Sequence, residues 1–188
     1  MSLDVVILGP PGAGKGTQAA RMSAEAGVPH VATGEMLRAA IAAGTPLGRR
    51  VREVVERGDL VSDELMIALI RERLALGDTE QGFILDGFPR TLPQAEALDA
   101  MLAELDRELT IVLAFQLPEE LAYERLLARG RSDDHPETIR HRLEAQRVPD
   151  DLVAYYRAKG ILVGVHAERP VDVVFAEVQG VLETAAAR

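Results

Sequence analysis

One segment near the start of the chain constrains the fold more than any other: an apolar run, a glycine-rich loop and a helix follow one another there. Residues 5–8 read Val-Val-Ile-Leu, a mostly β-branched run typical of a buried strand. The loop 9–17 (GPPGAGKGT) ends this run, and helical spacing follows from Lys15 to Ala26. Glycines let a loop turn its N–H groups inward around an anion, and the helix that follows points its positive end at the same place. The segment therefore predicts a phosphate-binding loop, with Lys15 reaching the phosphates.

This loop meets the general phosphate-loop pattern only in a variant form. The strict pattern has Ser or Thr directly after the lysine, whereas here Gly16 intervenes and Thr17 follows. GTPase-like switches, motor ATPases and small-molecule kinases all share such a loop, so the loop alone leaves the reaction open. A glycine-rich turn with a solvated lysine is the simpler alternative, and the order of strand, loop and helix argues against it.

The rest of the chain alternates between short apolar runs and segments with helical spacing. We expect further strands at 28–31, 83–86, 111–117 and 161–165, and helices at 33–43, 46–57, 62–76, 92–107, 118–129, 136–147, 150–158 and 171–186. Apolar strands that alternate with helices indicate a parallel sheet buried on both faces. Ligands of such sheets bind beyond the carboxyl ends of the strands. The loop at Gly9 and the carboxylate of Asp86 both follow strand ends, so we expect them to meet at one site.

Composition limits the partners and the location. A chain of 188 residues favours one compact domain. It has no cysteine, which excludes disulfides, cysteine nucleophiles and thiolate zinc sites. The formal net charge of −9 disfavours a general nucleic-acid surface but leaves room for a small anion in a basic pocket. No apolar run is long enough for a membrane span, and the first residues lack the basic region of a signal peptide. A cytoplasmic monomer is the expectation.

Five separated motifs carry further information. They stand at 9–18, at 32–38 (ATGEMLR), at 58–65 (GDLVSDEL), at 82–91 (GFILDGFPRT) with Gln94, and at 129–134 (RGRSDD) with Arg142. The loop variant is the one that nucleoside monophosphate kinases use. With all five motifs the chain resembles the adenylate kinases, and the likeness extends from Val5 to about Phe175.

The resemblance implies a fold and a domain organisation. The fold is an α/β three-layer sandwich like that of P-loop nucleoside triphosphate hydrolases, with a five-stranded parallel sheet and helices on both faces. Residues 1–188 form a single kinase domain, with an AMP-binding insert at about 33–61 and a short lid at about 128–135.

The resemblance also implies a reaction and its residues. The reaction is the reversible, magnesium-dependent transfer of the terminal phosphoryl group of ATP to AMP, giving two ADP, without zinc. ATP is held by Gly12, Ala13, Gly14, Lys15, Gly16, Thr17, Arg129 and a backbone carbonyl near Arg169. AMP is held by Thr33, Arg38, Asp59, Leu60, Val61, Gly87, Phe88, Pro89, Arg90, Gln94, Arg131 and Arg142. The catalytic cations are Lys15, Arg90, Arg129, Arg131 and Arg142, and Asp86 holds magnesium through water.

This chemistry suits the residues. Phosphoryl transfer needs positioning and charge stabilisation more than covalent help, and one well-placed arginine can be worth about 10³–10⁵ in rate. Arginine binds phosphate oxygens bidentately. The phosphate of AMP is already ionised, so no general base is needed. A lid that closes only on both substrates would keep water from attacking ATP.

Each assignment has a structural alternative. Asp86 can cap the turn that follows it, Arg38 can form a surface ion pair, and Gln94 can lie on an ordinary helix surface. Acidic residues surround Arg129, Arg131 and Arg142, so ion pairs can occupy some of these arginines. We expect solvated faces for Arg125, Arg140 and Arg147, and structural or exposed positions for the four histidines: His30, His135, His141 and His166.

Two other functions remain as rivals. Pyrimidine monophosphate kinases resemble this chain in the loop and in DGFPR, but they usually have Ala where Thr33 stands and Asn near Gln94, so these two residues favour AMP. A nucleotide-dependent switch or binding module would need the loop, but not arginines that converge on a second phosphate. The chain departs from the family at 146–151, where the family often has a Tyr and a Thr-x-Pro stretch.

Overall fold

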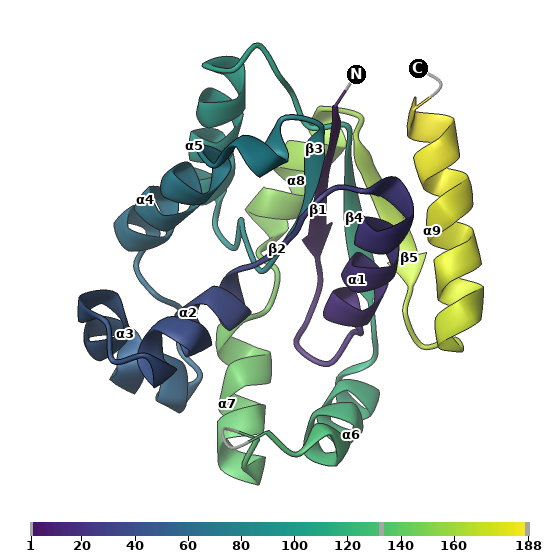
Figure 1. Cartoon of the computed structure of the whole chain (residues 1–188). Helices are drawn as coiled ribbons and strands as arrows, with labels where there is room; N and C mark the ends of the chain where they lie inside the picture. Colours follow the sequence, from purple (N-terminus) through teal and green to yellow (C-terminus); the bar gives the residue numbers. More distant parts are fainter. Residues whose placement is uncertain (1, 132–133, 187–188) are drawn as a thin grey trace.

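The computed structural model describes residues 2–131 and 134–186, and a five-stranded parallel sheet lies at its centre (Figure 1). The strands are β1 (Leu3–Leu8), β2 (His30–Ala32), β3 (Gly82–Asp86), β4 (Ile111–Gln116) and β5 (Leu162–His166). Their order is β2-β3-β1-β4-β5, and every neighbouring pair is parallel. The predicted α/β class with a five-stranded parallel sheet is confirmed.

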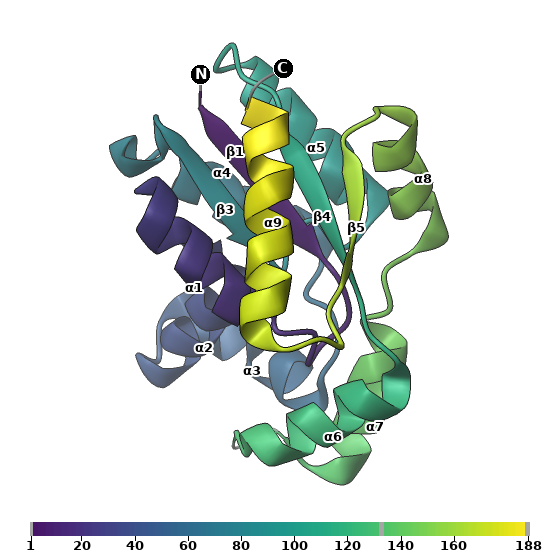
Figure 2. The ribbon, with the colours of Figure 1, turned by 90° about the vertical axis from the view of Figure 1, so that its right-hand side faces the viewer.

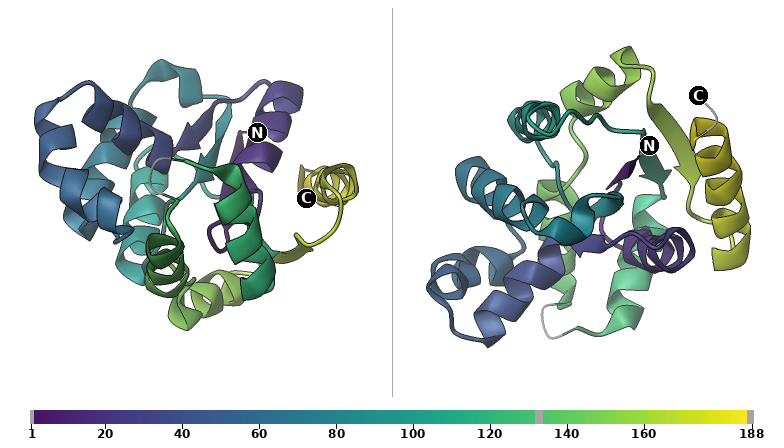
Figure 3. Two further views of the ribbon diagram at one scale, coloured as in Figure 1. Left: turned by 90° about the horizontal axis from the view of Figure 1, so that it is seen from below. Right: turned by 45° about the horizontal axis from the view of Figure 1, so that its top comes forward.

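Helices cover both faces of this sheet, as Figures 2 and 3 show. The helices of the described residues are α1 (Lys15–Ala26), α2 (Thr33–Ala42), α3 (Pro46–Arg57), α4 (Asp63–Leu74), α5 (Leu92–Ala103), α6 (Glu119–Arg129), α7 (Pro136–Ala145), α8 (Asp150–Ala158) and α9 (Val171–Ala186). Helices α1 and α9 lie on one face, and α4, α5 and α8 lie on the other. In the part of the chain that the structure describes, no helix is long and apolar enough to cross a membrane.

Burial on both faces explains why the strands are apolar without alternation. Val5 and Ile7 of β1 belong to the core that α1 and α9 cover. The residues between and after them, Val6 and Leu8, belong to the opposite core, beneath α5 and α8. All four are at most 4% exposed, so successive side chains of one strand contribute to two separate cores.

Two helical hairpins lie beyond the carboxyl ends of the strands: α2–α3 on one side and α6–α7 on the other (Figure 1). Thr45 begins α3, because its hydroxyl accepts a hydrogen bond from the Gly48 N–H at 3.0 Å. The two helices of the first hairpin meet closely at Gly48, where a Cβ atom would lie 2.0 Å from the Ala40 carbonyl oxygen. The site described below lies between these hairpins.

Several helix ends differ from the expectation, most clearly at α5. The spacing predicts a helix over 92–107, but α5 ends at Ala103. Asp106 has a left-handed φ of 54°, which turns the chain, and Arg107 pairs with the fully buried Asp4 at the start of β1. The Arg107 N–H also donates to the Leu102 carbonyl at 2.9 Å, so a local turn ends this segment and the pair with Asp4 holds that turn against β1. Similarly, α4 ends at Leu74, and a 3₁₀ turn at Gly77–Thr79 follows it.

Candidate active site

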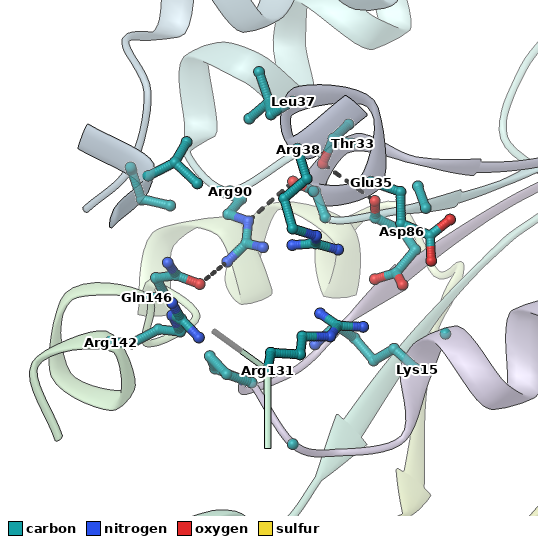
Figure 4. A pocket seen from close by; sticks show the side chains of 18 of the residues that line it. Lys15, Thr33, Glu35, Leu37, Arg38, Asp86, Arg90, Arg131, Arg142 and Gln146 are labelled. Atoms are coloured by element: carbon teal, nitrogen blue, oxygen red, sulfur yellow. Dashed lines mark hydrogen bonds between the residues drawn. The ribbon is translucent and has the colours of Figure 1, made fainter. Parts of the chain in front are cut away.

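A polar pocket of about 750 Å³ opens at the carboxyl ends of β1, β2 and β3 (Figure 4). Its lining comes from the glycine-rich loop, the start of α2, the segment 59–61, the end of β3, and helices α6 and α7. Ile7 of β1 pairs in register with Asp86 of β3, which places the glycine-rich loop and Asp86 side by side. Two segments far apart in the sequence thus meet at one site, as the sheet argument predicts.

The glycine-rich loop wraps around the amino group of Lys15. The Lys15 Nζ donates to the carbonyl oxygens of Gly9 at 3.0 Å and Pro10 at 2.9 Å. Loss of hydration in the pocket lowers the pKa of Lys15 from 10.5 to about 8; Asp86 opposes this shift, while Arg90 and Arg129 add to it. Burial in the pocket thus disfavours the charged form of Lys15, and an anion bound beside the amino group would favour that form.

Asp86 faces the start of α1, since a Cβ atom on Gly16 would lie 3.6 Å from its Oδ2. The Nε2 of His30 lies 3.8 Å from the same oxygen, and both side chains are largely buried. Burial opposes ionisation of Asp86, but His30, Lys15 and Arg90 outweigh it and hold its pKa below the ordinary value. Among the described residues no hydrogen bond joins this carboxylate to the turn that follows, so the capping alternative gains no support.

Arg90 is held by its neighbours rather than extended into solvent. Its Nε donates to the Gly87 carbonyl at 2.9 Å, and one terminal nitrogen donates to the Gln146 Oε1 at 2.8 Å. Its backbone N–H donates to the Gln94 Oε1 at 2.7 Å, and the Gln94 Nε2 donates to Asp63 at 2.8 Å. Gln94 is only 2% exposed, so the alternative of a surface glutamine is wrong.

Thr33 and Arg38 lie at the start of α2 and line the same pocket. The Thr33 hydroxyl donates to the Asp86 carbonyl at 3.3 Å. Gly87 has a φ of 88°, and a Cβ atom there would lie 2.4 Å from that hydroxyl, so this turn requires glycine. Arg38 makes no ion pair within residues 2–131 and 134–186, and its guanidinium lies beside Gly34. The described residues therefore do not support the alternative that Arg38 forms a surface ion pair.

A buried carboxylate holds the arginines of the α6–α7 hairpin. The side chain of Asp134 is fully buried. It accepts from the Arg129 Nε at 2.8 Å, from a terminal nitrogen of Arg129 at 2.7 Å and from one of Arg142 at 3.1 Å. Burial opposes ionisation of Asp134, but Arg129, the Arg131 backbone N–H and Arg142 outweigh it and lower its pKa.

The alternative that ion pairs occupy some of these arginines is thus confirmed for Arg129 and Arg142, which also line the pocket, as Arg131 does. Residues 132 and 133 of the expected lid lie outside the described residues.

Four of the expected site residues do not line this pocket. Ala13 and Phe88 are 3% and 1% exposed and do not contribute to its lining. Pro89 lines a small neighbouring cavity. Arg169 lies apart, where it donates to the His166 carbonyl at 3.2 Å and pairs with Glu177.

Four polar side chains line the pocket without having been expected there: His30, Glu35, Arg125 and Gln146. Arg125, expected on a solvated face, is half-buried and lines the pocket. It donates to the carbonyls of Ala167 at 2.9 Å and Glu168 at 3.3 Å, next to the segment that contains Arg169. Its spacing of four residues before Arg129 on one helix is the signal that could have placed it. Gln146 gave no such signal.

Comparison with known proteins gives one consistent result. A family model described as adenylate kinase matches residues 7–161. The adenylate kinase of Thermus thermophilus is 50% identical over 183 residues, which cover 95% of this chain and 96% of that protein. The adenylate kinase of Parasynechococcus marenigrum is 46% identical over 183 residues, covering 97% and 100%. That of Archaeoglobus fulgidus is 40% identical over 213 residues, covering 96% and 98%.

Proposed function

This chain belongs to the adenylate kinase family, and we propose from that premise how its pocket carries out phosphoryl transfer from ATP to AMP. The family and its named relatives support this reaction, which interconverts adenine nucleotides. One observation carries the assignment of the site: in a chain of net charge −9, seven cationic side chains line one pocket. They are Lys15, Arg38, Arg90, Arg125, Arg129, Arg131 and Arg142.

We assign the half of the pocket beside α1 to ATP. The N–H groups of residues 12–17 and the start of α1 form a cradle for its phosphates. Lys15 and Arg129 stabilise the transferred phosphoryl group. Arg125 fixes the backbone of 167–168, which lies next to the carbonyl of Arg169 that we assign to the adenine.

We assign the other half to AMP. Thr33, Arg38 and the backbone of 59–61 bound it on one side, and 87–90 with Gln94 bound it on the other. Arg131 and Arg142 come from the α6–α7 hairpin and add positive charge around the acceptor phosphate. The α2–α3 hairpin is the proposed AMP-binding insert, and the turn between α6 and α7 is the proposed lid.

The mechanism follows from these positions. The two phosphate tails are brought together between Lys15 and Arg90, so the ionised oxygen of AMP can attack the terminal phosphorus of ATP in line. In the transition state, negative charge spreads over the oxygens of the phosphoryl group that is being transferred. The fixed cations stabilise this charge without having to reorganise. Since the nucleophile is already ionised, no side chain has to remove a proton. The lid excludes water as an alternative acceptor.

The residues fit a magnesium ion that arrives with ATP. Magnesium is usually held through one or two carboxylates together with substrate phosphates and water. Asp86 is one such carboxylate beside the phosphate loop, and its surroundings keep it ionised. Among the residues that the structure describes, no three acidic or histidine side chains gather to hold a metal. The magnesium ion would neutralise phosphate charge.

The proposal is tested by the choice of acceptor. Purified protein with magnesium and ATP should form diphosphate fastest with AMP, more slowly with CMP or UMP, and not without magnesium. A faster rate with CMP or UMP would favour a pyrimidine monophosphate kinase, and no transfer to any of the three would favour a nucleotide-dependent switch. Replacing Arg90 by Ala should lower kcat by about two decades or more while the protein still folds. Full activity of that variant would remove Arg90 from the site.

The lid, the location and the oligomeric state are part of the same proposal. Amide hydrogen exchange at 128–131 and 134–135 should slow when an analogue bridging both nucleotide sites binds, and an unchanged rate would count against the lid. We propose that the chain acts in the cytoplasm as a monomer. Light scattering of the purified protein tests the monomer.

A further inference from the structure

We propose that Gln146 is a positioning residue that fixes Arg90 and ties it to the end of the AMP-binding insert. The inference rests on the proposed function, since it concerns how the acceptor side of that site is held. Gln146 lies just after the end of α7 and lines the main pocket. Figure 4 shows its amide directly beside the Arg90 guanidinium.

The first step is the orientation of the amide. The Gln146 Oε1 accepts from Arg90 at 2.8 Å, and the Nε2 donates to the Gly58 carbonyl at 2.7 Å. In the reversed orientation, two donors would face each other at Arg90 and two acceptors at Gly58. Only one orientation of the amide satisfies both neighbours, so this side chain distinguishes its two partners.

The second step is what the bond does to Arg90. A guanidinium carries five N–H groups in a rigid plane. The bond to Gln146 and the bond from Nε to the Gly87 carbonyl engage two of them, one at each end of that plane. Two anchors fix the direction of the plane, and the other N–H groups are available to a phosphate. Without the glutamine, the guanidinium could rotate about its remaining anchor.

The third step is the link to the insert. Gly58 follows α3 and has a left-handed φ of 85°, and the segment 59–61 that lines the pocket begins directly after it. The insert and α7 also meet at His141, whose Nε2 lies 2.6 Å from the Asp59 Oδ1. Gln146 therefore connects the position of the insert to the orientation of the catalytic arginine through one side chain.

A double-mutant cycle on AMP kinetics tests this. Gln146→Met keeps the size of the side chain but removes both hydrogen bonds. We expect kcat/KM for AMP to fall about 10- to 100-fold, with KM for ATP within about twofold of wild type and an unchanged thermal midpoint. In an Arg90→Met background, the same substitution should have almost no further effect, because Gln146 acts through Arg90.

The control variant is Glu144→Gln, a change at an exposed residue of α7 outside the main pocket, which should keep wild-type kinetics. The inference is overturned if Gln146→Met lowers kcat/KM for AMP by the same factor in the Arg90→Met background as in the wild type. Equal losses for AMP and ATP would also overturn it.

A readout without turnover separates this inference from the proposed function. The Arg90 Nε–H signal in ¹⁵N NMR should be resolved in the nucleotide-free wild type and should broaden or shift in Gln146→Met. If that change is seen but no acceptor is phosphorylated by the wild type, the proposed function fails and the positioning role holds. If the Arg90 signal is the same in both proteins, the positioning role fails whatever the activity.

Discussion

Binding of ATP to the nucleotide-free protein should take up protons at mildly alkaline pH, and Lys15 is the residue responsible. Its pKa of about 8 means that roughly half of the molecules lack the Lys15 proton at pH 8. Phosphates placed beside the amino group favour its charged form and raise the pKa again. We therefore expect an uptake of about 0.5 proton per ATP at pH 8, and of about 0.1 at pH 7.

The same shift predicts how the stability of the nucleotide-free protein depends on pH. The Lys15 pKa is lowered on folding, so the unfolded chain binds more protons than the folded one between pH 8 and 10.5. The free energy of unfolding should gain from this residue as the pH rises through that window. The fall from 10.5 to about 8 corresponds to about 3 kcal/mol in total.

Titration calorimetry in two buffers of different ionisation enthalpy measures the proton uptake directly. A non-hydrolysable magnesium–ATP analogue at pH 8 avoids turnover, and its phosphates are fully ionised there. The uptake should vanish in Lys15→Met, measured at protein concentrations that compensate for weaker binding. The reasoning is refuted if the wild type shows no uptake at pH 8, or if the Lys15→Met protein shows the same uptake as the wild type.

Three further substitutions test other parts of the structure. Asp134→Ala should lower kcat about 10²-fold, because Arg129 loses its buried anchor, and steady-state kinetics at saturating substrates measures this. Asp4→Ala should cost about 3–5 kcal/mol of unfolding free energy, because it leaves Arg107 without its buried partner. Urea denaturation should show that loss, while kcat of the Asp4→Ala protein should stay unchanged, since the pair lies at the opposite end of the sheet from the pocket. Gly87→Ala should raise KM for AMP about tenfold, because the new methyl group strikes the neighbouring threonine hydroxyl; an unchanged KM would show that the turn adapts.

The sheet, and the meeting of the glycine-rich loop with Asp86 at its edge, could be predicted because they depend on local patterns. Apolar runs such as 5–8 and 111–117 determine strands, and parallel strands bring their carboxyl ends to one edge. The phosphate loop is also a local signal, since its glycines and Lys15 are consecutive. The same argument placed Asp86 correctly beside this loop, although Asp86 ends β3 and the loop follows β1.

The remaining features depend on contacts between distant segments, which a local pattern does not encode. The pair between Arg107 and Asp4 joins the turn after α5 to β1. Arg125 enters the pocket because carbonyls of residues 167 and 168 hold its guanidinium. Gln146 has no motif of its own. Its partners Arg90 and Gly58 follow β3 and α3, two elements that only the fold brings together.

The buried carboxylate of Asp134, between α6 and α7, means that a nucleotide phosphate has to displace an anion of the protein itself. Asp134 already neutralises charge on Arg129 and Arg142 before any substrate arrives. A phosphate that binds these arginines replaces the Asp134 carboxylate as their counterion, rather than anions from the solution. Ionic strength should consequently affect binding less steeply than seven cationic side chains would suggest.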